Sequence, residues 1–183
     1  MTPTPCRISF QFDWEREDDG HPRAWSPTAE DAADRGSLDL YGELRITLDC
    51  GAERHELDLW EVSDDLFRMF QVLAEDLVVC SSSSTEVIGN DDRDFRMRRE
   101  GRRLVFRQDT WFNAAEQRWM KGAEGLREFS VDGLDLARTF FGAARRFLDE
   151  FAASIAAAQR AQLGPFRASM EDAERKAVQA WSR

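Results

Sequence analysis

The stretch that decides the fold is DFRMRREGRRLVFR, residues 94–107. Apolar residues alternate with charged ones on both sides of its centre, a period of two that is typical of strands. Glu100 and Gly101 stand at the centre as a two-residue tip, so the pattern predicts a hairpin in which Met97 faces Leu104. This register places four apolar side chains on one buried face: Phe95, Met97, Leu104 and Phe106.

Arginine dominates the rest of the same hairpin, and four of its arginines form a candidate basic patch: Arg96, Arg98, Arg103 and Arg107. Arginine-bearing hairpins enter nucleic-acid grooves or hold acidic partners. A solvated sheet face, whose arginines neutralise acids elsewhere in the fold, is the simpler interpretation. No aromatic residue is interleaved with the arginines, which disfavours stacking on single-stranded nucleic acid.

Other elements follow on both sides. Alternation predicts a strand over 6–14 and a hairpin over 38–59 that turns at Gly51 and Ala52, with Ile46 facing Leu57. We expect a helix from Ser63 that ends before the serines at 81–84, and a short strand over 128–131. A long helix capped by Asp132 should end at Gly164 and Pro165, and an amphipathic helix should follow over 166–181, while 111–125 is ambiguous between helix and loop.

This order predicts an α+β fold, with an antiparallel sheet built from hairpins, helices packed on one face and a long helix near the C-terminus. The length of 183 residues predicts a single domain over 1–183 with a C-terminal helical pair at 133–181.

Charge is distributed unevenly along the chain. Residues 1–92 hold 22 Asp and Glu against 7 Arg, whereas residues 93–183 hold 13 against 18 Arg and Lys. The stretch 15–36 carries seven acids and no periodicity, so we expect an acidic loop there. Acids beside exposed aromatics suit protein interfaces. The candidate protein-binding residues are Asp18, Asp19, Trp25, Glu30, Asp31, Tyr41 and Trp60.

Several classes of site lack their signatures. Phosphate-binding, nucleophile-elbow and zinc-protease motifs are absent from the sequence, so we expect no catalytic residue, no metal and no cofactor. Cys50 and His55 would lie near each other across the first hairpin, but two ligands do not make a metal site. The three cysteines, Cys6, Cys50 and Cys80, contain no CxxC pair, a usage that a reducing compartment permits. We therefore expect a cytoplasmic protein, neither exported nor membrane-spanning.

The stretch 40–77, which contains LYGELRITLD, HELDLWEV and a capped helix, and the later VDGLDLARTF resemble small uncharacterised bacterial α+β proteins of the polymorphic-toxin immunity type. The resemblance implies a non-enzymatic cytosolic protein-binding module, an inhibitor or immunity protein, and assigns no functional residue. With the net charge of −10, it implies a basic protein partner such as a toxin or a nucleic-acid-binding protein. A homo-oligomer is compatible with the sequence. The alternative is an enzyme or nucleic-acid-binding protein with a site assembled from dispersed residues, including the Arg-rich hairpin 96–107.

Overall fold

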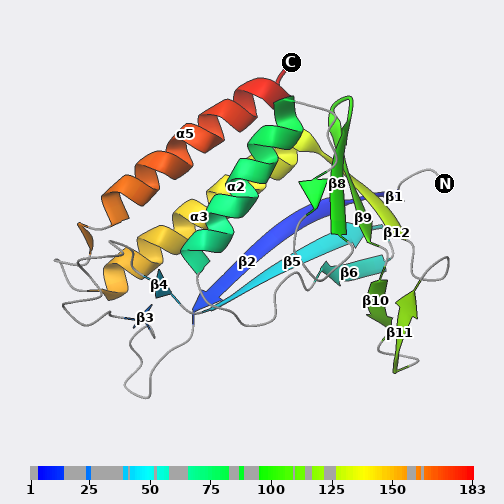
Figure 1. Ribbon diagram of the computed structural model, residues 1–183, viewed down its shortest axis with the longest axis horizontal. Helices are drawn as coiled ribbons and strands as arrows, with labels where there is room; N and C mark the ends of the chain where they lie inside the picture. Colours follow the sequence, from blue (N-terminus) through cyan, green and yellow to red (C-terminus); the bar gives the residue numbers. More distant parts are fainter. Residues whose placement is uncertain are drawn as a thin grey trace.

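The structure of the protein is a computed structural model (Figure 1). The residues that it describes are 4–14, 24–25, 39–40, 42–51, 53–57, 66–82, 87–88, 95–108, 110–113, 117–121, 127–155, 160–161 and 163–183. Within them the predicted α+β fold is confirmed. Sheets built from antiparallel hairpins lie on one side, and three helices lie on the other (Figure 1).

A five-stranded sheet forms the part of the fold that contains the arginine-rich hairpin, with the order β1-β12-β9-β8-β7. All neighbours in it are antiparallel except β1 and β12. Its strands are β1 (Thr4–Pro5), β7 (Val87–Ile88), β8 (Phe95–Glu100), β9 (Arg103–Gln108) and β12 (Arg127–Asp132). The strand predicted over 128–131 is thus β12, and it lies between β1 and β9.

The tip of the hairpin β8–β9 differs from the prediction. Glu100 pairs with Arg103, so the two-residue tip is Gly101–Arg102 and not Glu100–Gly101. Gly101 has a φ of 61° and stands at the first central position of the turn. A type II′ turn needs a positive φ only there, whereas a tip one residue earlier would force this conformation on Glu100. The backbone freedom of glycine therefore decides the register.

The change moves every cross-strand pair by two residues. Met97 pairs with Phe106 instead of Leu104, and Phe95 pairs with Gln108. Because a shift of two residues preserves the alternation between faces, the predicted apolar face survives. Met97, Leu104 and Phe106 are all buried.

A three-stranded sheet has the order β2-β5-β6 and confirms the register predicted for the first hairpin. Its strands are β2 (Arg7–Trp14), β5 (Gly42–Cys50) and β6 (Glu53–Leu57). Ile46 pairs with Leu57 as predicted, and Gly51 begins the tip with a φ of 76°. Leu44, Ile46 and Leu48 of the central strand are buried, whereas the neighbouring Arg45 and Asp49 are exposed.

The ambiguous region 111–125 contains strands. β10 (Thr110–Asn113) and β11 (Arg118–Lys121) pair antiparallel, with Trp111 opposite Met120. Their aromatic residues favour strands, but the turn between them carries no glycine signal, and Gln117 adopts a φ of 52° instead. A further two-residue pair joins β3 (Ala24–Trp25) to β4 (Asp39–Leu40).

The three helices are α2 (Leu66–Ser82), α3 (Gly133–Ser154) and α5 (Leu163–Trp181). Ser63, predicted to begin the first helix, lies outside the described residues, and α2 continues through Ser82, past its predicted end. The prediction that the long helix reaches Gly164 is wrong. It ends at Ser154, and Ile155 is already extended. Pro165 lies in the first turn of α5, where its missing N–H costs no hydrogen bond.

The core forms between the sheets and the helices. α2 and α3 lie against the strands, and α5 packs across these two helices on the side away from the sheets (Figure 1). Phe12 of β2 contacts Phe70 of α2 and Phe147 of α3, with ring centroids 4.2 and 5.7 Å apart. α3 buries an apolar stripe at helical spacing, which Ile155 continues just after its end: Ala137, Phe140, Ala144, Phe147, Leu148, Phe151 and Ile155.

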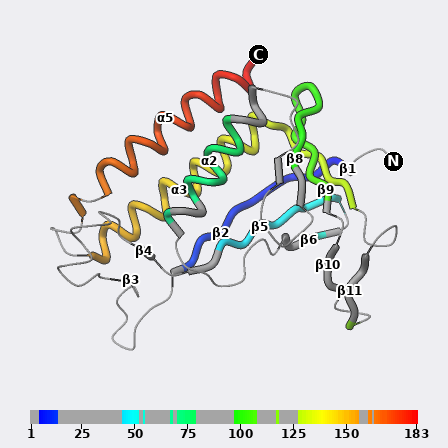
Figure 2. The backbone as a smooth tube through the Cα atoms, viewed as in Figure 1, coloured from blue at the N-terminus to red at the C-terminus, as the bar shows by residue number. Residues whose placement is uncertain are grey.

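The N-terminal strand joins the two sheets. β1 pairs in parallel with β12, the N–H of Cys6 donates to the carbonyl oxygen of Ser130 at 2.8 Å, and β2 then pairs antiparallel with β5. Figure 2 shows this path as one continuous tube that runs beneath the helices. As β12 continues into α3 and β1 continues into β2, the two chain segments separate, and the candidate site lies at this fork.

Candidate functional site

The predicted basic patch is divided among neighbouring strands that also carry acids. In the ladders Arg96 lies opposite Arg107, and Arg107 lies opposite Glu128 of β12. Four residues further along each strand, Glu100 lies opposite Arg103, which lies opposite Asp132. Each row therefore places a carboxylate beside an arginine, a match that cross-strand pairing favours, although Arg96 and Arg107 also face each other.

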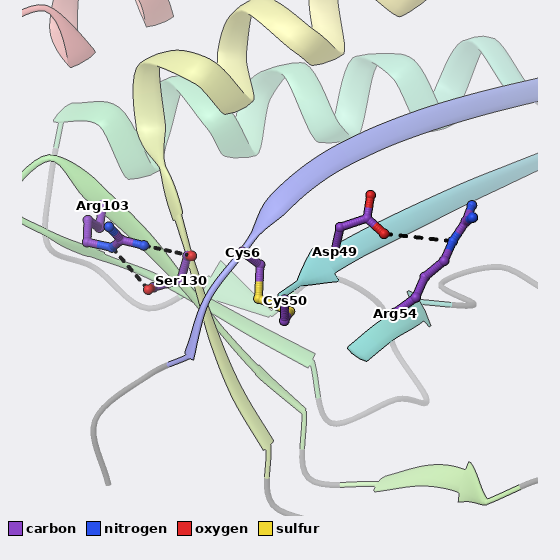
Figure 3. Close-up of a disulfide and its surroundings, with 6 residues drawn as sticks. All are labelled: Cys6, Asp49, Cys50, Arg54, Arg103 and Ser130. Atoms are coloured by element: carbon purple, nitrogen blue, oxygen red, sulfur yellow. Dashed lines mark hydrogen bonds and ion pairs between the residues drawn. A yellow bond between two sulfur atoms is a disulfide. The ribbon is translucent and has the colours of Figure 1, made fainter. Parts of the chain in front are cut away.

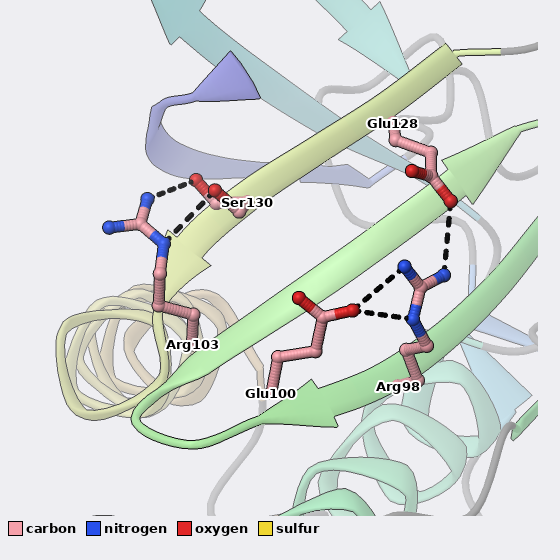
Figure 4. Close-up of polar contacts among 5 residues, drawn as sticks. All are labelled: Arg98, Glu100, Arg103, Glu128 and Ser130. Atoms are coloured by element: carbon pink, nitrogen blue, oxygen red, sulfur yellow. Dashed lines mark hydrogen bonds and ion pairs between the residues drawn. The ribbon is translucent and has the colours of Figure 1, made fainter. Parts of the chain in front are cut away.

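Arg98 is held by two carboxylates (Figure 4). Its guanidinium forms ion pairs with Glu100 at 2.8 Å and with Glu128 at 3.0 Å. Partial burial by itself lowers the pKa of Arg98, but the hydrogen bonds to Glu128 and Glu100 outweigh burial, so its pKa lies above the ordinary value. This side chain is engaged within the sheet and is not offered to a polyanion.

Arg103 is engaged in the same way. Its Nε donates to the hydroxyl oxygen of Ser130 at 3.0 Å, and a terminal nitrogen donates to the carbonyl oxygen of Ser130 at 2.9 Å (Figure 4). Ser130 and Val105 lie side by side in the ladder and are buried, at 4% and 1% exposure. Arg98 and Arg103 of the predicted patch therefore both have intramolecular partners. This arrangement favours the solvated, charge-balanced face over a nucleic-acid interface.

The tip of the hairpin β8–β9 is packed against the ends of two helices. Arg99 lies 4.4 Å above the ring of Trp181, the last residue of α5. Trp181 in turn lies so close to Gly133 that a Cβ at that position would approach its ring to 2.0 Å. The N–H of Gly133 donates to the carbonyl oxygen of Arg102 at 2.8 Å, while Asp132 caps α3. These contacts fix the hairpin tip beside the start of α3.

An open groove of about 740 Å³ occupies the fork between β2 and the start of α3. It is lined by three arginines and three aspartates together with small and apolar residues: Pro5, Cys6, Arg7, Ile8, Asp49, Gly51, Arg103, Val131, Asp132, Asp135, Arg138 and Thr139. The balance of charge suits a polar or polypeptide ligand better than a simple anion. Sequence reasoning missed this groove because its lining comes from six separate strands and helices.

A disulfide between Cys6 and Cys50 borders the groove (Figure 3). Cys6 directly precedes β2 and Cys50 ends β5, so the two residues lie one position beyond the pair Arg7–Asp49, with Cα atoms 4.2 Å apart. Cys6 and Cys50 are therefore paired, although the cysteine spacing in the sequence did not indicate a pair. The sulfur of Cys50 is bonded to Cys6, and the residue opposite Cys50 on β6 is Glu53, while His55 lies opposite Leu48. Cys50 and His55 therefore do not form a ligand pair.

The predicted acidic interface lies almost wholly outside the described residues. This holds for Asp18, Asp19, Glu30, Asp31, Tyr41 and Trp60, while Trp25 is placed in β3, opposite Asp39. The structure does describe the base of the segment that carries most of these residues. Trp14 and Gly42 are direct partners at the end of the β2–β5 ladder. The segment 15–41 therefore begins and ends at one place, the end of the sheet opposite the disulfide.

Among the described residues, no group of three or more His, Cys, Asp or Glu is placed to hold a metal ion. No helix in this part of the chain is both long enough and apolar enough to span a membrane. Comparison of the chain with protein-family models, with curated proteins and with solved structures found no match.

Proposed function

We propose that the protein is a non-enzymatic, cytoplasmic protein-binding module that masks a basic partner through an acidic surface, in the manner of an inhibitor or immunity protein. The partner belongs to the class of basic toxins or nucleic-acid-binding proteins. The acidic segment between β2 and β5 supplies the surface, with Asp18, Asp19, Glu30 and Asp31 as its charges. Trp25, Tyr41 and Trp60 supply apolar contact area.

The observation that carries the proposal is the division of charge between the framework and the rest of the chain. The described residues hold 21 Lys and Arg against 17 Asp and Glu, a surplus of four positive charges. The remaining residues hold 4 Arg against 18 Asp and Glu, a surplus of 14 negative charges. The net negative charge of the protein therefore comes from residues outside the described ranges.

A concentrated negative field suits a basic protein partner. It accelerates encounter with a positive surface and is screened over about 8 Å at physiological salt. The framework acids next to the predicted basic patch are already used, because Glu100 and Glu128 pair with Arg98. Because Arg98 is already paired, the alternative hypothesis of an Arg-rich nucleic-acid site has less support than the hypothesis of an acidic protein-binding surface.

The decisive experiment compares charge reversal in the acidic segment with the same change in the framework. Affinity capture at low salt, followed by mass spectrometry, identifies candidate partners. Association kinetics are then measured for the wild type, for Asp18→Lys with Asp19→Lys, and for the control Glu150→Lys with Glu171→Lys, which alters two exposed framework acids. The first pair should slow association about tenfold and flatten its salt dependence, while the control should leave both nearly unchanged.

A shortened chain tests the same proposal without added charge. Removal of residues 16–35 leaves the directly paired Trp14 and Gly42 joined by a short connection, so the β2–β5 register is retained. Equal affinity and equal salt dependence in the shortened and full-length proteins would refute the proposal. Tight binding of a labelled oligonucleotide that is lost in Arg98→Ala would instead support the alternative.

A further inference from the structure

The Cys6–Cys50 bond lies at the joint between the two main sheets. Cys6 is the single residue between β1, which belongs to the five-stranded sheet, and β2, which belongs to the three-stranded sheet. Its partner Cys50 is the last residue of β5, just before the tip at Gly51. The bond therefore ties the N-terminal strand to the neighbouring strand at the point where it changes sheets (Figure 3).

The attachments of the chain differ on the two sides of this bond. On one side, β2 forms an eight-residue ladder with β5, from Arg7 opposite Asp49 to Trp14 opposite Gly42. On the other side, β1 contributes only two residues to its parallel ladder with β12, supplemented by the hydrogen bond from Cys6 to Ser130. A ladder of two residue pairs opens with little free energy. The disulfide thus secures the weaker side.

The bond is also within reach of small thiols. Cys6 lines the open groove together with Arg7 and Gly51, and both cysteines are only partly buried. Thiol–disulfide exchange requires that the attacking thiolate reach a sulfur atom, so access decides its rate. A disulfide sealed in the core would react only after unfolding, and this one borders solvent.

We propose that Cys6 and Cys50 form a reversible thiol switch that fixes or releases the N-terminal strand at the joint between the sheets and so sets the shape of the groove. Glutathione is the redox partner. One glutathione thiolate attacks a sulfur of the bond, which breaks the bond and forms a mixed disulfide. A second glutathione displaces the cysteine thiol. The protein gains two electrons and two protons, and the two glutathiones leave as glutathione disulfide.

The switch acts locally. Reduction leaves the eight-residue β2–β5 ladder and the helical core in place, because neither depends on the bond for its own hydrogen bonds or packing. It frees Thr4, Pro5 and Cys6 to separate from β12, which removes one wall of the groove. Oxidation closes the wall again. Cys80 takes no part in this exchange.

The experiment places the purified full chain in glutathione buffers of graded reduction potential. Mass spectrometry after alkylation gives the fraction of Cys6 and Cys50 in thiol form, and NMR-detected hydrogen exchange reports on individual amides. We expect one two-electron transition, with the Cys6 amide exchanging about tenfold faster in the reduced protein. Amides of Gln11 in β2 and Phe147 in α3 serve as internal controls and should remain protected in the reduced protein.

Two variants complete the test. Cys80→Ser should show the same transition as the wild type, and the double variant Cys6→Ser with Cys50→Ser should exchange like the reduced protein in every buffer. Equal exchange of the Cys6 amide in oxidised and reduced wild type would overturn the proposal. So would complete loss of protection at Gln11 and Phe147 on reduction, because the whole fold, and not only the N-terminal strand, would then open. Since these readouts use the wild type, the proposal does not depend on folding of the double variant.

Discussion

The two main sheets are secured in different ways at the ends where their hairpins turn. The three-stranded sheet has a covalent bond beside its tip, between Cys6 and Cys50. The five-stranded sheet has packing at its tip, where Arg99 covers Trp181 and Trp181 fills the space over Gly133. The first attachment depends on the redox state of the two cysteines. The second depends on how closely the Trp181 ring fits against Arg99 and Gly133. We therefore expect the two sheets to fail under different challenges.

The largest effect should come from Trp181 at the end of α5, because its ring contacts both the hairpin tip and the start of α3. It is only 1% exposed, and Trp181→Ala should lower the free energy of unfolding by about 3–5 kcal/mol. The indole N–H has no hydrogen-bond partner within the described part of the chain. Trp181→Phe, which keeps a ring and removes this donor, should therefore cost far less. Chemical denaturation measures both variants, and equal losses would contradict packing as the cause.

Loss of the disulfide should have the next largest effect. The bond closes a loop between residues 44 positions apart, and loop-closure entropy allows a contribution of about 2–4 kcal/mol. Cys6→Ser with Cys50→Ser should lower the unfolding free energy by this amount in the absence of reductant. The same double variant should match the wild type once both are measured in dithiothreitol. A difference that persists in dithiothreitol would show that packing of the sulfurs, and not the cross-link, is responsible.

The two tips themselves should respond alike, since each begins with a glycine at positive φ. A Cβ would meet no atom within 4 Å at Gly51 or at Gly101. Gly51→Ala and Gly101→Ala should therefore each cost about 1 kcal/mol, from backbone conformation alone. Thermal or chemical unfolding measures the pair. A much larger loss at one tip would show that its backbone is further constrained by contacts to the rest of the fold.

The register of these hairpins shows how far sequence reasoning reaches. Alternation alone identified both hairpins and the buried face of each, because a period of two is local information. The position of Gly51 fixed the first register correctly. The second prediction put Gly101 at the wrong place in its turn, although a type II′ turn prefers glycine at the first central position. Closer attention to turn chemistry would have given the observed tip.

The candidate site was much less accessible to prediction. Its groove and its disulfide depend on the pairing of β2 with β5, whose partners are joined by the long segment 15–41 and carry no local turn signal. Once Arg7 is placed opposite Asp49, Cys6 necessarily lies opposite Cys50. Composition identified the arginines of the basic patch. Their acidic partners could not be predicted, because these lie partly on β12, which follows 20 or more residues later in the chain. Long-range pairing is what the sequence pattern did not supply.

The smallest expected effect concerns α2, the helix that lies against strands of both sheets, and it depends on pH. Burial, together with the charge of Glu75, raises the pKa of Asp76 from 3.8 to about 6. The ionised carboxylate therefore opposes folding at pH 7. As the pH falls through 6 the folded state binds a proton before the unfolded state does, so stability from this group grows and is complete below about 4. Because Asp76 is partly exposed, solvent screening should keep the effect within about 1 kcal/mol.

Asp76→Asn tests this by removing the titration while keeping the shape of the side chain. The variant should be more stable than the wild type at pH 7, and its advantage should shrink as the pH is lowered to 4.5. Comparison of the two proteins at each pH cancels the titration of most other carboxylates, and Glu150→Gln, at an exposed position, supplies a matched control. If the advantage of Asp76→Asn is the same at every pH, Asp76 does not titrate in this range.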